Sequence, residues 1–152
     1  YKFNKKNCEI HGLGLNGYKY KKKLTLNTGN SGTLARLIVG LLIHAKEKIK
    51  IIGDESLSKR DFYRVTKPLE KFGAKFKTNN GKLPITIKGT TNPKSINYNE
   101  SKGSAQCKSA VMLASLNTKG MTSIKAKKSR NHSELLFKNL KIPIKIIEKK
   151  KI

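Results

Sequence analysis

Residues 29–42 of this 152-residue chain read GNSGTLARLIVGLL and carry a clear helical pattern. The large apolar residues of this stretch fall at i, i+3, i+4, i+7 and i+8, which places them on one face of an α-helix beginning just after residues 29–32. They are Leu34, Leu37, Ile38, Leu41 and Leu42. A short strand is expected next, at residues 48–52. The opening stretch therefore predicts a helix that leads into a strand.

Further signals follow in the first half of the chain. Phe62, Val65, Leu69 and Phe72 mark a second helix, and Gly73 is its natural stop. A strand is expected at residues 74–77. The Asn-Gly pair within residues 79–81 tolerates the positive φ angles of a tight hairpin turn, after which residues 84–88 alternate like a returning strand. The predicted order is helix, strand, helix, strand, strand.

The same order starts again near residue 96. The sequence predicts a short strand at 97–98, a helix at 104–116, a strand at 121–126, a helix through Leu135, Leu136 and Leu140, and a strand at 142–147. A repeated element order with a period of roughly seventy residues indicates an internal duplication. Both copies are expected to share one core, with the sheets outside and the helices inside, or the reverse.

Both predicted copies begin their first helix with small or hydroxyl residues, at 29–33 and at 103–106. The first turn of a helix has N–H groups without internal partners and a partial positive charge, so it binds phosphate or carboxylate. The alternative is ordinary N-capping by Asn30, Ser31 or Ser104. An arginine at the start of each second helix, Arg60 and Arg130, favours anion binding, because a guanidinium forks onto an oxyanion.

The net charge is +25, from 34 basic and 9 acidic residues. Such a charge attracts phosphates, nucleic acids or anionic membranes. Only four of the basic residues are arginine, and the lysines are spread along the whole chain, whereas a nucleic-acid footprint forms a stripe. No apolar run approaches the length that crosses a bilayer, so we expect a soluble protein. A lysine-rich nucleic-acid-binding module remains the alternative function.

Other chemical signals are weaker. Residues 12–17 match the dinucleotide fingerprint but precede a charged stretch where an apolar helix should open. Cys107 falls within an apolar helix and is expected in the core, and Cys8 is too distant to indicate a disulfide scaffold or zinc site. His132 is a candidate general base, although a surface residue is the simpler interpretation. No partner is expected for His11 or His44. The adjacent acids Asp54 and Glu55 are the last candidates.

Four motifs together resemble a known family. They are LNTGNSGTLARL at residues 26–37, GDESLSKR at 53–60, SAQCKSA at 104–110 with Leu113 and Ala114, and SRNHSE at 129–134. In order and spacing they resemble 5-enolpyruvylshikimate-3-phosphate synthase, whose members are nearly three times as long. This resemblance covers nearly all of the chain.

The resemblance implies an α/β (α+β) fold of repeated βαβαββ units, with helices packed inside and sheets outside. It implies a single-domain fragment in which residues 1–18 hold the last strand of a truncated first unit, around residues 7–10. Residues 19–93 would form a complete unit, and residues 94–152 would form a further unit that is incomplete at its C-terminal end. The first residue is Tyr1, not Met, which also leads us to expect a piece of a longer chain.

The reaction implied by the resemblance is the addition of the 5-hydroxyl of shikimate 3-phosphate to phosphoenolpyruvate, followed by loss of phosphate. By motif, phosphoenolpyruvate would contact Asn30, Gly32, Arg60 and Gln106. Shikimate 3-phosphate would contact Ser104, Ala105, Gln106 and Arg130. No cofactor, metal, nucleic acid or membrane is expected, and the enzyme would be cytoplasmic, in a biosynthetic route to aromatic amino acids.

Some positions depart from the family pattern. Asp61 stands where proline is usual and is expected to tilt the second helix or partly neutralise Arg60. Asn131 replaces an aspartate, and residues 102–103 replace a more apolar lead-in to Ser104. Gly32 keeps the small residue that leaves room for the inhibitor glyphosate.

The family's proton-handling acids belong to segments not found in this sequence. Because catalysis needs positioned acid and base groups, we expect no catalytic residue in these 152 residues and no turnover by the chain alone. The expected partners are the two substrates, the remainder of the enzyme and a second copy of the chain, which would cover an exposed apolar face.

Overall fold

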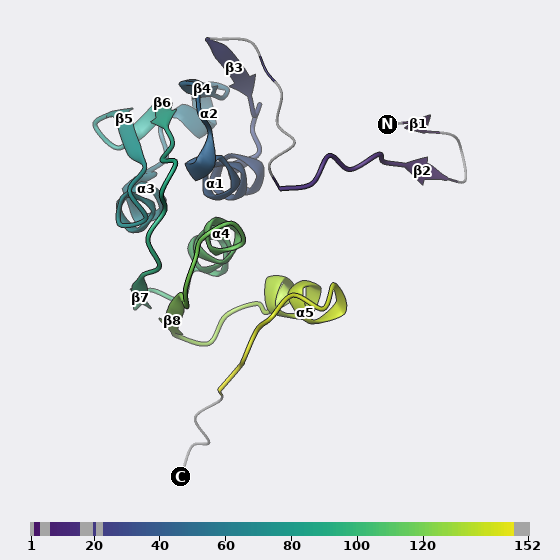
Figure 1. Cartoon of the computed structure of the whole chain (residues 1–152). Coiled ribbons are helices and arrows are strands. Elements are labelled where there is room, and N and C mark those ends of the chain that lie inside the picture. Colours follow the sequence, from purple (N-terminus) through teal and green to yellow (C-terminus); the bar gives the residue numbers. More distant parts are fainter. Residues whose placement is uncertain (1, 4–6, 16–19, 21–22, 148–152) are drawn as a thin grey trace.

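The first half of the chain forms a four-stranded sheet with helices on one face (Figure 1). The computed structural model describes residues 2–3, 7–15, 20 and 23–147. The strand order is β3-β4-β6-β5, with β3 parallel to β4 and the other pairs antiparallel. The strands are β3 (Leu24–Asn27), β4 (Ile49–Ile52), β5 (Lys75–Asn79) and β6 (Lys82–Lys88). The predicted strands at 48–52, 74–77 and 84–88 are thus confirmed.

The hairpin between β5 and β6 forms where the sequence predicts it. Asn80 and Gly81 have φ values of 47° and 78°, the left-handed conformations that a tight turn requires. Side chains on β6 alternate, so Leu83, Ile85 and Ile87 are buried against the helices.

Both predicted helices of the first repeat form where the sequence predicts them. The bounds are α1 (Gly32–Leu41), a 3-10 turn η1 (Leu42–His44), α2 (Glu55–Ser58) and α3 (Tyr63–Glu70). The buried face of α1 differs from the prediction, because Ala35 and Val39 are fully buried, whereas Leu34 of the predicted apolar face is 48% exposed. Gly73 lies just beyond the end of α3. β3 and α2 were not predicted from the sequence, because each is only four residues long and gives no more than two periods of a strand or about one turn of a helix.

The second repeat contains β7 (Asn97–Glu100), α4 (Ala105–Ser115), β8 (Ser123–Ala126) and α5 (His132–Asn139). β7 and β8 pair in parallel across α4, as β3 and β4 do across α1. This equivalence supports the duplication. The predicted strand at 142–147 is wrong: Pro143 cannot donate to a ladder, and no strand in the described part of the chain pairs with that segment.

The core lies between the two sheets. Helices α1, α3 and α4 separate the four-stranded sheet from the β7–β8 pair, so the helices are inside and the sheets outside, as expected (Figure 1). At Gly40 the backbones of α1 and α4 approach so closely that a Cβ would overlap the carbonyl group of Ala110. Cys107 is buried in this core, as predicted.

The N-terminal segment extends away from the repeats in Figure 1. It contains a short antiparallel pair, β1 (Lys2–Phe3) with β2 (Cys8–Glu9). β2 falls where a strand was expected, around residues 7–10, and its assignment to a further unit stays a prediction. The dinucleotide-like motif at 12–17 lies partly outside the described residues.

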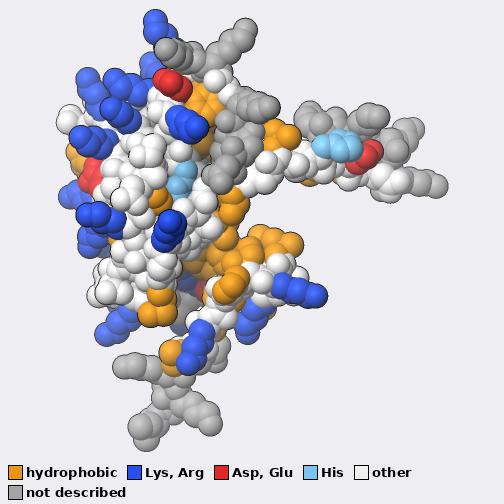
Figure 2. All heavy atoms as spheres, viewed as in Figure 1, with side chains coloured by type: hydrophobic (Ala, Val, Ile, Leu, Met, Phe, Trp, Pro, Cys, Tyr) orange, Lys and Arg blue, Asp and Glu red, His pale blue; other side chains and the backbone are white. Residues whose placement is uncertain are grey.

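The charge is distributed widely. Figure 2 shows Lys and Arg side chains at many places on the body of the molecule, separated by uncharged and hydrophobic surface. None of the helices in the described part of the chain has the length and apolar character needed to cross a bilayer.

Candidate functional site

The N-terminus of α1 is capped by Ser31, whose Oγ accepts from the Leu34 N–H at 3.1 Å. Asn30 has a different role. Its Nδ2 donates to Oδ2 of Asp54 at 2.7 Å, while Oδ1 of Asp54 caps α2 by accepting from the Leu57 N–H. The motif containing Asn30 is therefore fastened to the motif that carries Arg60.

The two first helices meet through Arg36 and Gln106. Arg36 Nη1 donates to Gln106 Oε1 at 3.0 Å and to the Gly32 carbonyl at 3.4 Å. Gln106 Nε2 donates to Thr33 Oγ1 at 2.7 Å. Both ends of the Gln106 amide are held by α1, so the structure joins the predicted residues Gly32 and Gln106.

Arg60 lies beside the same glycine. A Cβ built on Gly32 would stand 2.8 Å from Arg36 Nη1 and 3.2 Å from Arg60 Nη1. Two guanidinium groups thus flank the first residue of α1, and the absence of a side chain on Gly32 leaves room for both. Arg36 was not among the predicted site residues, because its position on the helix pattern does not reveal which element packs against it.

The cluster of guanidinium groups is electrostatically crowded. Burial lowers the pKa of Arg36, and the positive charges of Arg60 and Arg64 act in the same direction, while Cys107 and Asp61 oppose them. The Arg36 guanidinium also lies 5.1 Å from the centre of the Phe62 ring. A bound anion would relieve the repulsion among these charges, so the geometry favours a phosphate or carboxylate ligand.

Asp61 lies two residues before α3 and does not pair with Arg60. Its Oδ1 accepts from the Tyr63 N–H at 2.8 Å. In the described part of the chain no ion pair joins Asp61 to Arg60. Asp61 therefore acts as a local helix-start acceptor, which a proline would not provide.

The N-terminus of α4 is capped by Ser104, whose Oγ accepts from the Cys107 N–H at 3.3 Å. The next two backbone N–H groups, of Ala105 and Gln106, have no hydrogen-bond partner among the described residues. The Ser104 N–H itself donates to the buried carboxylate of Glu100 at 2.7 Å. Nearby on β7, burial raises the pKa of Tyr98 to about 12.

Arg130 is the predicted site residue that the structure leaves apart. Its side chain is exposed and has no hydrogen bond or ion pair to another described residue. Its backbone carbonyl accepts from Nζ of Lys108 at 3.1 Å, and the same ammonium pairs with Glu134. Lys108 thus fixes the main chain at Arg130, a role that the helix pattern does not predict.

Other candidates have structural partners. His44 Nε2 lies 3.3 Å from the Ala114 carbonyl and His11 lies 3.0 Å from Glu9, so the expectation that neither histidine has a partner is wrong. Glu55 pairs with Lys59, and since Asp54 caps α2, the two acids do not form a shared site. His132 is exposed at the first turn of α5. No group of three potential metal ligands gathers within the described ranges.

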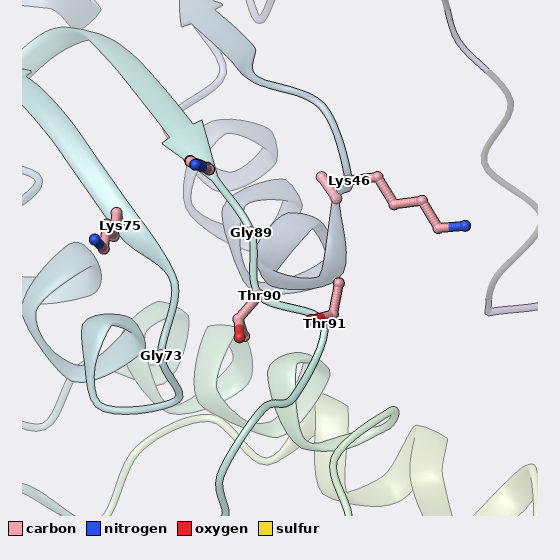
Figure 3. Close-up of a pocket in the computed structure, with 8 residues that line it drawn as sticks. Lys46, Gly73, Lys75, Gly89, Thr90 and Thr91 are labelled. Carbon is pink, nitrogen blue, oxygen red and sulfur yellow. The ribbon is translucent and has the colours of Figure 1, made fainter.

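A hollow of about 320 Å³ lies at the other end of α1 and α3, lined by Ala45, Gly73, Lys75, Gly89 and Thr90 among others. Figure 3 shows that the Lys46 side chain extends away from Gly89 and Thr90. Since the hollow lies at the opposite helix ends from the guanidinium groups, it is not part of the anion site.

Comparison with known proteins identifies similar sequences and folds. The whole chain, residues 1–152, matches the family described as EPSP synthase (3-phosphoshikimate 1-carboxyvinyltransferase). The chain is 47% identical over 150 residues to the 3-phosphoshikimate 1-carboxyvinyltransferase of Ruthia magnifica subsp. Calyptogena magnifica, covering 97% of this chain and 34% of the relative. It is 41% identical over 143 residues to that of Lactococcus lactis subsp. lactis (strain IL1403), covering 92% and 33%.

A solved structure of EPSP synthase from Acinetobacter baumannii superimposes with a TM-score of 0.79 and 39% identity, over 85% of this chain and 29% of that one. The match supports the α/β arrangement described above. The chain spans about a third of the length of the curated relatives it matches.

Proposed function

This chain belongs to the EPSP synthase family, and from that premise we propose that it provides a substrate-binding part of a shikimate-pathway enolpyruvyl transferase. The reaction transfers the enolpyruvyl group of phosphoenolpyruvate to the 5-hydroxyl of shikimate 3-phosphate and releases phosphate. The observation that carries this proposal is the bridge from Arg36 to Gln106, which joins the two repeats beside Arg60.

Phosphoenolpyruvate is assigned to Asn30, Gly32, Arg60 and Gln106. A ligand with a phosphate and a carboxylate suits the crowded guanidinium groups of Arg36 and Arg60. The bond from Asn30 to Asp54 supports the assignment, because it holds the Asn30 amide near the α2 segment that leads to Arg60.

Shikimate 3-phosphate is assigned to Ser104, Ala105, Gln106 and Arg130. The two open N–H groups of Ala105 and Gln106 suit a phosphate oxygen at the positive end of α4. Gln106 would lie between the ligands, since it also contacts the guanidinium group of Arg36. Arg130 is exposed and would turn toward the phosphate on binding.

The chain alone would bind ligands weakly and would not turn over. The site as described contains donors of hydrogen bonds and positive charges, and its acids cap helices or pair with bases. Positioned groups for proton transfer would have to come from elsewhere in the enzyme. Product formation by the purified 152-residue chain, free of host enzyme, would contradict this.

The site assignment is tested by an amide-resolved NMR titration of the chain with shikimate 3-phosphate at moderate salt, with inorganic phosphate in parallel. We expect shifts concentrated at Ser104, Ala105 and Gln106 that exceed those caused by phosphate. Arg130→Met should weaken them, whereas Lys128→Met, a change of an exposed neighbouring charge, should not. Shifts spread evenly over the exposed lysines, and lost as salt rises, would instead favour nonspecific polyanion binding.

A cytoplasmic location belongs to the same proposal and is supported by the thiols of Cys8 and Cys107, which are both free.

Self-association of the chain also belongs to the proposal. It is supported by the exposed leucines Leu135, Leu136 and Leu140 of the α5 region. Sedimentation over a range of protein concentrations tests self-association, because a monomer at all concentrations would exclude it.

A further inference from the structure

Glu100, the last residue of β7, has a buried carboxylate that faces the loop leading into α4. The residue is only 4% exposed. Its Oε2 accepts from the Ser104 N–H at 2.7 Å and its Oε1 accepts from the Lys102 N–H at 3.3 Å. Acidic side chains are rarely buried unless their oxygens are satisfied, so this pair of bonds accounts for the placement.

The loop from β7 to α4 has few other anchors. In the described part of the chain no other hydrogen bond holds residues 101–103, and Gly103 turns the backbone with a φ of 73°. The main chain of Glu100 is itself fixed, because its carbonyl accepts from the Lys127 N–H at 3.1 Å. Glu100 therefore anchors residues 101–103 to the β7–β8 pair.

Glu100 also connects the two repeats. Arg64 of α3 places its Nη2 3.7 Å from Oε1 of Glu100. The Arg64 side chain is 41% exposed, so this ion pair is screened by solvent and contributes less than the two bonds to backbone N–H groups.

These contacts determine which donors remain for a ligand. The Ser104 N–H donates to Glu100, while the N–H groups of Ala105 and Gln106 in the first turn of α4 have no hydrogen-bond partner among the described residues. The Ser104 hydroxyl accepts from Cys107, so its hydrogen remains available. The direction of all three donors depends on where Ser104 is held.

We propose that Glu100 is a positioning residue for the anion-binding end of α4, acting through the Lys102 and Ser104 N–H groups. The ligand, shikimate 3-phosphate, rests on the proposed function. Two effects of the carboxylate have opposite signs: it orders the donors, which strengthens binding, and its negative charge repels phosphate, which weakens binding. The proposal is that ordering dominates.

The test compares Glu100→Ala and Glu100→Gln with Glu70→Ala, a change of an exposed acid on α3. Hydrogen exchange of the Ser104 amide is measured first, without ligand, and then the affinity for shikimate 3-phosphate is measured by NMR. We expect Glu100→Ala to speed Ser104 exchange and to weaken binding by about tenfold. Glu100→Gln retains a carbonyl acceptor and should keep binding within about threefold of the original. Glu70→Ala should change neither.

Unchanged or tighter binding by Glu100→Ala would overturn the proposal, because the charge effect would then dominate. Equal losses in both variants would also overturn it, since hydrogen-bond geometry would not be the cause. If the unsubstituted chain fails to bind shikimate 3-phosphate, the proposed function fails, and Ser104 exchange still decides the role of Glu100. Exchange that is unaltered by Glu100→Ala would reject that role.

Discussion

The N-terminal end and the middle of the α1–α4 interface differ sharply. Arg36 faces Gln106, Gly40 faces Ala110 and His44 faces Ala114, so the two helices run in the same direction and each of these pairs is separated by seventy residues, the period of the repeat. At the first pair a half-buried guanidinium group contacts a side-chain amide. At the second the contact is backbone against backbone with no room for a side chain.

We expect the middle of the interface to determine the stability of the fold and its N-terminal end to determine ligand binding. The equivalent helices of the duplicated units pack in register, and the tight middle of their interface holds the repeats together. The N-terminal ends of both helices then lie side by side, which concentrates their partial positive charges beside the guanidinium groups. A duplicated unit thereby forms one site from two helix ends.

The largest effect is expected from Gly40→Val, which breaks the tight middle. The new side chain would overlap the Ala110 carbonyl, so the helices must separate. We expect a loss of about 3 kcal/mol in the free energy of unfolding, measured by urea denaturation. Gly12→Val is the control, because a Cβ at Gly12 meets nothing within 4 Å. Equal stability of the two variants would show that the helices do not pack as described.

Arg36→Met disrupts the N-terminal, charged end of the interface. Methionine keeps the apolar stem and removes the donor to Gln106 and to the Gly32 carbonyl. We expect the affinity for phosphoenolpyruvate, followed by NMR, to fall by about tenfold, because a charge-assisted hydrogen bond and one positive charge are lost.

Two readouts separate this effect from misfolding. The Gln106 side-chain NH₂ signal should shift even without ligand, while the free energy of unfolding changes less than in Gly40→Val. Lys59→Met, an exposed change near Arg60, is the control. Unaltered affinity in Arg36→Met would remove Arg36 from the site.

The structural features that depend on a local or repeated sequence pattern could be predicted from the sequence. The positions of α1 and α4, the hairpin at Asn80 and Gly81, and the duplication are all local or repeated signals, whereas the buried face of α1 was not predicted correctly. The resemblance supplied Gly32, Arg60 and Gln106, and the structure brings these residues together.

Contacts between residues seventy positions apart could not be predicted from the sequence. The bond from Arg36 to Gln106 and the contact of His44 with Ala114 depend on how two helices dock, which helix periodicity does not specify. The failed strand at residues 142–147 has the same cause, since an apolar segment becomes a strand only beside a partner. Glu100 was likewise missed because its partners are backbone N–H groups.

Gly32→Ala tests the charged end of the interface. Its Cβ would stand 2.8 Å from Arg36 Nη1 and 3.2 Å from Arg60 Nη1, and both guanidinium groups would have to move. The affinity for phosphoenolpyruvate should fall by about fivefold, equal to roughly 1 kcal/mol. Stability should hold or rise slightly, because alanine favours a helix more than glycine. A parallel loss of stability and affinity would mean that the glycine serves the fold.

The smallest effect concerns His44, at the neutral end. Burial lowers the pKa of His44 below its ordinary value of 6.5, although the bond to the Ala114 carbonyl opposes this. The neutral imidazole is therefore favoured in the folded state, so its contribution is present above pH 6.5 and is lost as the pH falls through the lowered pKa. Thermal unfolding between pH 7 and pH 5 should show a decline in Tm that His44→Gln reduces. His132→Gln, at an exposed histidine, should leave the decline intact. An identical decline in all three proteins would mean that protonation of His44 does not affect the contact between α4 and the end of η1.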